Sequence, residues 1–396
     1  MKKILFVTTR NVLTSSGELR LIKNRAEALF HFFGIITDFI VLQKPDRIAS
    51  KNKECIDAGG EVMAFPAAFT NPIQMAQSFK TAYQIIKHKL DTGNYGMIIF
   101  SGHGFNAWPR KIKKFNNLPI VFDIHGANED LVEVAKKSGL LKAMALRASF
   151  IIENYLSKNY LSHADGALVV TKALEDYTKI RYRIPAKFKF YTVPCATSSL
   201  SIDAEHYLEY RKQYRKKYGI SDDEIVFIYS GGISPWQCIE ETILLYKRLQ
   251  CLIKQKSRLI IFSFNIDSIM NLLAGTNTIF DSYTPDKLVQ ALCAGDYAMM
   301  LRHDNLTNNV AFPNKYLEYV QSGMSIITTI YVYEIAEQIK QYDLGVLYDM
   351  SEDISKLVSY IDEGRNKKHY NTKQIDEVLT HNSFKERLKS LAEDLI

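Results

Sequence analysis

Residues 224–264 read EIVFIYSGGISPWQCIEETILLYKRLQCLIKQKSRLIIFSF. An apolar run at 225–229 is followed by Ser230-Gly231-Gly232, and a second apolar run occupies 258–264. Between them, residues 239–253 carry apolar side chains at helical spacing. Short buried strands joined by a helix of this length are typical of parallel sheets covered on both faces. This stretch therefore predicts a βαβ unit at the start of an α/β domain.

The same alternation extends in both directions along the 396 residues, which suit two domains. We predict strands at 3–9, 37–43, 61–67, 96–104, 118–126 and 166–170 in the first half, and at 277–283, 296–302 and 325–329 in the second. The expected organisation is a Rossmann-like domain at 1–198, a charged, Tyr-rich linker at 199–222, and a second Rossmann-like domain at 223–396. Residues 376–396 are expected to form one amphipathic helix.

Composition excludes several classes of protein. Hydrophobic residues make up 47% of the chain and charged residues 23%, as in an ordinary globular protein. The apolar start is interrupted by Arg10 and is better interpreted as a strand than as a signal peptide, and no long uncharged apolar run follows. The five cysteines form no CxxC pair, which favours a reducing cytoplasm and disfavours a zinc site.

Charge is unevenly distributed. Residues 1–200 hold 28 Lys/Arg and 16 Asp/Glu, whereas the remainder holds 22 and 27. The basic half is expected to meet something anionic. Residues 108–114 (WPRKIKK) place a tryptophan beside four cations, and 139–161 is strongly apolar with isolated cations. We predict peripheral contact with the inner face of the cell membrane; the alternative is a solvated face and a core helix. Nucleic-acid binding is not expected, because no recognised module is present.

Ligands of open parallel sheets bind at the carboxyl ends of the strands. Ser15-Ser16-Gly17 follows the first strand, and Ser230-Gly231-Gly232 follows the first strand of the second half. Small residues before a helix allow backbone N–H groups to approach a phosphate, although each loop is also interpretable as a tight turn. No G-x-G-x-x-G is present, so a nicotinamide cofactor is not predicted.

Two histidines, His103 and His125, also follow apolar strands and precede glycines. Their positions favour at least one of them facing the ligand. Asp123 is expected to orient a neighbouring group. No third convergent ligand is evident, so no metal site is predicted.

Residues 301–323 combine a loop and a helix. Asn308 and Asn309 lie before Pro313 and are candidates to present donors to a ligand. Lys315 and Glu318 are three residues apart and share a helix face. Taken alone, that spacing favours a simple surface ion pair.

These segments resemble the retaining glycosyltransferases of the GT-B fold, family 4 type (glycosyl transferases group 1). The resemblance extends over most of the chain. Its most specific part is P-x-K-x-x-E-Y-x-x-x-G at 313–323. Weaker support comes from residues 224–249, 120–126 (IVFDIHG) and 162–174 (SHADGALVVTKAL). It implies two Rossmann-like domains facing across a cleft, with the C-terminal helix packing back on the first.

The resemblance also assigns roles. In the family motif Glu-x7-Glu the second glutamate holds the ribose hydroxyls, a role that passes to Glu318. The first falls on Val310, a departure, which leaves the donor sugar to Asp304, Asn308, Asn309 or the backbone from Val310 through Ala311 to Phe312. Gly232 and Gln237 stand where the family has Arg and Lys, so Arg302 and Lys315 are the expected substitutes at the diphosphate. His125 and the loop Ser15–Gly17 match the first-domain site, to which His103 is added.

The expected function is transfer of a sugar, with retention, from a nucleoside-diphosphate sugar (UDP is favoured) to an acceptor hydroxyl. The expected catalytic residues are His125, Arg302 and Lys315, without metal or other cofactor. A glycan or lipid-linked acceptor in surface polysaccharide or glycolipid biosynthesis is the favoured context. The alternatives are a sugar-nucleotide epimerase of the same fold and a degenerate subunit that activates a partner.

Overall fold

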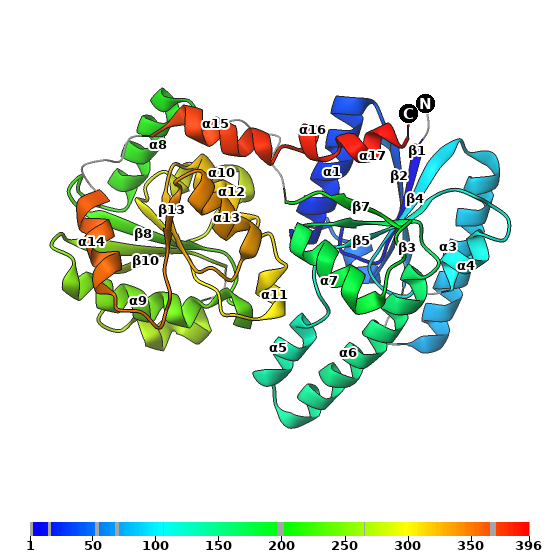
Figure 1. Ribbon diagram of the computed structural model, residues 1–396, viewed down its shortest axis with the longest axis horizontal. Helices are drawn as coiled ribbons and strands as arrows, with labels where there is room; N and C mark the ends of the chain where they lie inside the picture. The colour runs from blue at the N-terminus through cyan, green and yellow to red at the C-terminus, as the bar shows by residue number, and fades with distance from the viewer. Residues whose placement is uncertain are drawn as a thin grey trace. The chain divides into compact units, whose positions relative to one another are not determined.

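The computed structural model describes residues 3–14, 17–51, 55–67, 71–105, 107–195, 202–264, 266–364 and 370–395. The chain divides into two compact units, which are coloured along the sequence in Figure 1. Unit 1 comprises Met1–Asn128, Arg147–Ser198 and Asn382–Ile396; unit 2 comprises Glu129–Leu146 and Ser199–His381.

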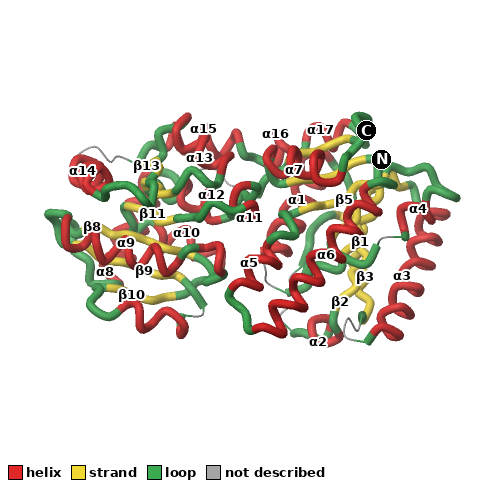
Figure 2. Tube along the Cα trace, turned by 60° about the horizontal axis from the view of Figure 1, so that its bottom comes forward, coloured by secondary structure: helices red, strands yellow, loops and turns green. Residues whose placement is uncertain are grey.

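Unit 1 is built on a parallel sheet in the order β3-β2-β1-β4-β5-β6-β7. The central strands are buried along nearly their whole length, because helices cover both faces of the sheet. Figure 2 shows this layering. The strands are β1 (Lys3–Thr8), β2 (Thr37–Gln43), β3 (Gly59–Pro66), β4 (Tyr95–Ser101), β5 (Ile120–Ile124), β6 (Gly166–Val169) and β7 (Lys189–Thr192).

The helices of unit 1 connect successive strands or extend from them. They are α1 (Gly17–Phe33), α2 (Pro45–Ile48), α3 (Pro72–Thr92), α4 (Trp108–Ile112), the greater part of α6 (Leu140–Leu161), α7 (Lys172–Tyr182), α16 (Phe384–Arg387) and α17 (Lys389–Glu393). The first turn of α7 is fixed by Thr171, whose hydroxyl accepts a hydrogen bond from the Leu174 N–H.

Unit 2 repeats the architecture with a parallel sheet in the order β10-β9-β8-β11-β12-β13. Its strands are β8 (Ile225–Ser230), β9 (Ser257–Phe262), β10 (Thr278–Asp281), β11 (Tyr297–Met300), β12 (Ser325–Thr328) and β13 (Gly345–Leu347). Its helices are α5 (Asp130–Lys136), α8 (Ala204–Lys217), α9 (Ile239–Leu252), α10 (Pro285–Leu292), α11 (Leu306–Asn309), α12 (Lys315–Gln321), α13 (Tyr333–Gln341), α14 (Ser355–Gly364) and α15 (Thr372–His381), with short 3-10 helices η1 (Pro235–Gln237) and η2 (Asp267–Leu273).

The predicted linker at 199–222 requires correction, because most of it forms α8 within unit 2. Arg211 and Arg215 on α8 both reach Asp296, at 2.7 and 3.4 Å, and Arg215 is buried. A long helix held by buried guanidinium contacts is part of the domain and not a tether between domains.

The predicted second domain is also too long at its end, and 376–396 is not one helix. Asn382 separates α15 from α16, and residues 382–396 belong to unit 1. Phe384, Leu388 and Leu391 are buried in the same hydrophobic core as α1 and β1. Residues 129–146, predicted in the first domain, group with unit 2, where α5 contacts η1.

Trp108 does not supply the interfacial aromatic expected of a membrane contact. It is buried in an aromatic cluster with Phe79, Phe100 and Phe105, at centroid distances of 5.1 to 6.0 Å. The aromatic ring is therefore part of the core, because burial of its apolar area stabilises unit 1. In the described part of the chain, no helix has the length and hydropathy needed to cross a bilayer.

Candidate functional site

The glycine loop of unit 2 begins where β8 ends. Gly231 has a φ of 121°, and an added Cβ would lie 2.9 Å from Lys315 Nζ. Its N–H donates to the Phe262 carbonyl at 3.0 Å, so it belongs to the sheet edge and is not free for a ligand. The Gly232 N–H has no hydrogen-bond partner within the described ranges. The Ser230 N–H donates to the Tyr319 hydroxyl at 2.9 Å. Of the three predicted loop residues, only Gly232 therefore keeps an N–H able to bind an anion.

Two cations converge beside this loop. Lys315 and Arg302 are only 8% and 2% exposed. Lys315 Nζ donates to Gln237 Oε1 at 2.7 Å and lies 4.3 Å from the centre of the Tyr229 ring. Arg302 Nη1 donates to the Gln237 and Leu301 carbonyls at 3.2 and 2.7 Å. Neither cation forms an ion pair with a carboxylate of the described residues.

The electrostatics of this pair follow from its burial. Desolvation and the Arg302 charge hold the pKa of Lys315 well below its usual range, and the charge of Glu318 offsets this only in part. Burial likewise lowers the pKa of Arg302. Two buried positive groups that repel each other are stabilised by an anion placed between them. The arrangement suits a diphosphate.

Glu318 lies one turn after Lys315 on α12 and is half-buried. The surface ion pair that the spacing also allowed is not formed, since the Lys315 ammonium is buried and bonded to Gln237. Glu318 therefore lies on the same helix as Lys315, one turn away from it, at the edge of the candidate site.

The loop between β11 and α12 is held by its own asparagines. Asn308 Nδ2 donates to the His303 carbonyl at 3.0 Å, and Asn309 Nδ2 donates to Asp304 Oδ1 and the Tyr331 carbonyl. Both side chains are buried, so their contacts shape the loop. The predicted role of these amides as ligand donors has no support from their orientation.

Val310 and Phe312 are also buried, whereas Ala311 is partly exposed. The Val310 and Ala311 N–H groups donate to the Leu306 and Asn308 carbonyls. The Phe312 N–H has no partner among the residues that the structure describes. Of the three predicted backbone donors, Phe312 alone keeps a free N–H.

Cys238, Glu241 and His303 form a further cluster, with one possible ligand atom each within 4.8 Å of one another. His303 Nε2 and Glu241 Oε1 lie 2.7 Å apart. Burial raises the pKa of the Cys238 thiol to about 11, so the sulfur is protonated at neutral pH. As it stands, the cluster is a histidine–carboxylate pair beside a neutral thiol.

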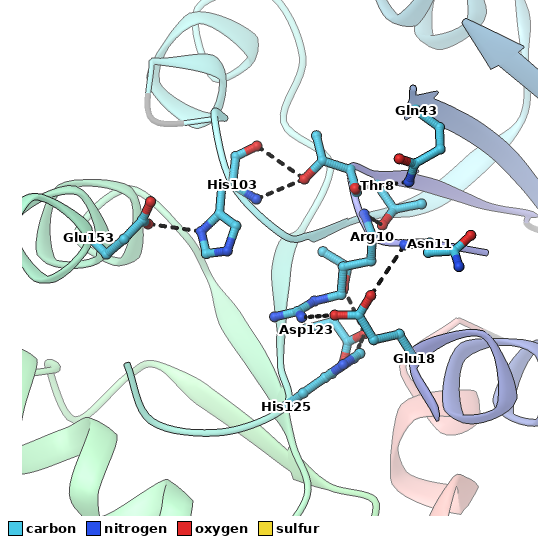
Figure 3. A network of polar contacts seen from close by, with 11 residues as sticks. Thr8, Arg10, Asn11, Glu18, Gln43, His103, Asp123, His125 and Glu153 are labelled. Carbon is cyan, nitrogen blue, oxygen red and sulfur yellow. Dashed lines mark hydrogen bonds and ion pairs between the residues drawn. The ribbon is translucent and has the colours of Figure 1, made fainter. Parts of the chain in front are cut away.

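Unit 1 has its own polar centre at the ends of β4 and β5 (Figure 3). Asp123 is buried and contacts Arg25 Nη1 at 2.8 Å and His125 Nε2 at 2.6 Å. Burial alone would raise the pKa of Asp123, but the charges of His125 and Arg25 hold it below its usual range. Burial lowers the pKa of His125, and Asp123 offsets this only in part. Asp123 is thus positioned to orient His125, as its spacing suggested.

A second set of contacts joins the end of β1 to α1 and α6, as Figure 3 shows. Arg10 Nη1 donates to Glu18 Oε1 at 2.5 Å. The imidazole Nδ1 of His103 lies 2.8 Å from Glu153 Oε2. The backbone N–H of His103 donates to Thr9 Oγ1 at 2.9 Å. His103 is well exposed, whereas His125 is only 13% exposed at its side chain. Of the predicted loop, Ser15 and Ser16 lie outside the described residues and Gly17 begins α1.

Sequence reasoning missed Arg10, Glu18 and Arg25. Arg25 carried a usable signal, because it lies next to an apolar stripe at helical spacing formed by Ile22, Ala26 and Leu29 on α1. A lone arginine beside such a stripe indicates a buried partner. Nothing in the local pattern identifies that partner as Asp123, which is 98 residues away.

Solved structures resemble the whole chain at low sequence identity. Sucrose-phosphate synthase from Thermosynechococcus elongatus matches with a TM-score of 0.69 and 13% identity, over 100% of this chain and 99% of that chain. WaaG, a glycosyltransferase involved in lipopolysaccharide biosynthesis, matches with a TM-score of 0.61 and 12% identity, over 99% of both chains. HepE of Anabaena in complex with UDP matches with a TM-score of 0.63 and 14% identity, over 100% and 99%.

The chain has the GT-B fold. The prediction of two parallel α/β domains of this class is confirmed. No protein-family model matches the sequence, and no curated protein matches it significantly. Within this GT-B chain, the cations and free N–H groups described above gather at the carboxyl ends of β8 and β11, where open parallel sheets bind ligands.

Proposed function

We propose that this GT-B protein is a glycosyltransferase that uses a nucleoside-diphosphate sugar. The observation that carries the proposal is the buried pair Arg302 and Lys315 beside the Gly231-Gly232 loop, without a carboxylate in ion-pair contact among the described residues. Two buried basic side chains without a carboxylate partner match a diphosphate better than a neutral ligand, because a bound anion favours their charged forms.

In the proposed reaction the bond between the sugar and the diphosphate breaks, an acceptor hydroxyl bonds to the anomeric carbon, and the hydroxyl proton passes to the departing diphosphate oxygen. The leaving diphosphate gains negative charge, which Arg302, Lys315 and the Gly232 N–H stabilise. Glu318 accepts hydrogen bonds from the vicinal ribose hydroxyls, a role suited to a carboxylate with two oxygens. The Phe312 N–H is the candidate donor to the sugar. We propose retention by front-face attack, on the strength of the resemblance to family 4.

In unit 1 we propose that His125 contacts substrate in its neutral form. Its lowered pKa and its contact with Asp123 support this assignment. A neutral imidazole held in one orientation can accept or donate a hydrogen bond without adding charge. His103 and Gly17 are assigned to the same region with weaker support.

The donor and acceptor classes are proposals drawn from similar proteins. HepE was solved with UDP and with UDP and glucose, and WaaG acts in lipopolysaccharide biosynthesis. We propose a UDP-linked sugar as donor, a glycan or lipid-linked acceptor in surface polysaccharide or glycolipid assembly, and a cytoplasmic location for the reaction. No metal or other cofactor is assigned.

Replacing Glu318 by alanine tests the ribose assignment. We expect UDP to raise the melting temperature of the wild type more than CDP or GDP does. In Glu318→Ala the Kd for UDP should rise roughly 10- to 100-fold, because a hydrogen bond to a charged group contributes about 1.5–3 kcal/mol. The measurement is a thermal-shift titration with each nucleotide.

The matched control is Glu337→Ala, which removes an exposed glutamate from α13 and should leave UDP binding unchanged. An unchanged affinity in Glu318→Ala would overturn the ribose assignment. Incubation with UDP-sugars alone separates the enzymatic alternatives: UDP release that needs no acceptor indicates an epimerase. Nucleotide binding without turnover of any donor and acceptor indicates a degenerate subunit.

A further inference from the structure

Helix α6 carries an apolar stripe that faces solvent. Six large apolar side chains on it are between 55% and 84% exposed: Leu140, Leu141, Met144, Ile151, Ile152 and Tyr155. With 3.6 residues per turn, these positions occupy about one third of the helix circumference. Contiguous exposed apolar surface of this kind marks a site of interaction, whereas scattered apolar residues do not.

The opposite side of α6 accounts for its packing. Ser157 and Leu161 are buried, and Tyr160 stacks on Phe122 of β5 with ring centroids 4.1 Å apart. Figure 1 shows the helix extending from this anchored end beyond the sheet of unit 1. The exposed stripe is thus additional to the face that the fold uses, and the core of unit 1 does not require it.

Charge along this segment selects its partner. Residues 134–152 contain four cations and no carboxylate. Lys142 and Arg147 on α6 are exposed and form no ion pair within the described ranges. The one acidic residue of the helix, Glu153, contacts His103. An apolar stripe flanked by cations matches the surface of an anionic bilayer, where aliphatic side chains enter the acyl boundary and ammonium groups meet lipid phosphates.

We propose that α6 is a monotopic membrane-docking helix that lies in the interface of an anionic bilayer through Leu140, Leu141, Met144, Ile151, Ile152 and Tyr155. Tyr155 is suited to the headgroup level, where an aromatic ring has one apolar side and one polar tip. Arg147 and Lys158, which lie at one edge of the stripe, contact lipid phosphates. Docking by α6 is independent of the donor chemistry of unit 2.

The test is flotation of the full-length protein with vesicles of equimolar phosphatidylcholine and phosphatidylglycerol. The wild type should float with these vesicles and much less with pure phosphatidylcholine. Ile151→Glu/Ile152→Glu should lower the partition coefficient at least tenfold, because two carboxylates enter the stripe. Thermal unfolding should be unchanged, since both positions are exposed.

The matched control is Ile73→Glu/Ile180→Glu, which makes the same charge change at isoleucines that are 72% and 81% exposed on α3 and α7. It should float like the wild type. Equal loss of flotation in both double variants, or no flotation of the wild type, overturns the proposal.

Light scattering tests self-association as the other use of the stripe. If the wild type forms an oligomer that dissociates only in Ile151→Glu/Ile152→Glu, and no variant binds vesicles, the stripe is a self-association surface and the proposal is wrong. UDP binding is measured on every variant, so failure of the donor site is seen separately.

Discussion

A Lys315→Met variant is expected to lose the proposed sugar-transfer activity and yet to unfold at a higher temperature than the wild type. Lys315 is buried and lies in the field of Arg302, and its lowered pKa means that the folded protein disfavours its charge. Methionine fills a similar volume without a charge, so the free energy of unfolding should rise by about 1–2 kcal/mol. The lost hydrogen bond to Gln237 and the lost contact with the Tyr229 ring reduce this gain.

The charge of Lys315 that lowers the stability of the free protein is expected to favour the proposed sugar transfer. Removing one group that stabilises a developing oxyanion typically lowers kcat about 10²- to 10³-fold. We expect a loss of this size in kcat/KM for Lys315→Met, once a donor and an acceptor are in hand, together with weaker UDP binding. The exposed Lys356, which pairs with Glu352 on the surface, supplies the control Lys356→Met, for which neither quantity should change.

The pH dependence fixes the sign of the stability effect. A lysine whose pKa is lower in the folded state binds fewer protons when folded, so stability rises with pH between the folded and unfolded values. The stability advantage of Lys315→Met should therefore shrink as the pH approaches about 10.4, the ordinary pKa of lysine. A variant that melts below the wild type at neutral pH would show that the ammonium stabilises the free protein, contrary to this account.

Asp123→Ala should destabilise unit 1 by about 3–5 kcal/mol, because it leaves Arg25 buried without its carboxylate partner. Among the described residues, Arg25 then keeps only its hydrogen bond to the Val193 carbonyl. The double variant Arg25→Met/Asp123→Leu should recover part of the loss, since it removes both charges and retains apolar volume.

The two tryptophans allow this to be measured in unit 1 alone. In a Trp236→Phe background, the remaining tryptophan is Trp108, which is buried in the core of unit 1. Its fluorescence during urea unfolding reports unit 1, so the measurement does not assume that the whole chain unfolds in one step. Asp176→Ala removes a surface ion pair with Lys172 and should cost at most about 1 kcal/mol.

At acidic pH the difference in the free energy of unfolding between the wild type and Asp123→Ala should disappear. The pKa of Asp123 is lower in the folded state, so its stabilising contribution is present above the unfolded value of about 3.9 and is lost as the pH falls below it. A cost below about 1 kcal/mol at neutral pH, or one that the double variant fails to reduce, would show that Arg25 finds another partner.

The sequence by itself predicted the α/β class, the inner strands of both sheets and the segment of the proposed donor site, but not the edge strands β7 and β13. Apolar runs such as 225–229 and the helical spacing of 239–253 are local patterns, and local backbone structure follows them. The same patterns placed Lys315 and Glu318 on one face of a helix after β11, which is where the structure has them.

The tertiary structure decided how far those residues are buried and which partners they contact. The spacing of Lys315 and Glu318 allowed a surface ion pair, but packing buries the ammonium against Gln237, 78 residues earlier. Trp108 was predicted at a membrane surface but is buried in the core of unit 1. Residues 382–396 belong to unit 1, and Arg25 forms an ion pair with Asp123. The burial of a side chain and the identity of its partner depend on contacts between residues far apart in the chain. The local spacing of apolar residues does not predict such contacts.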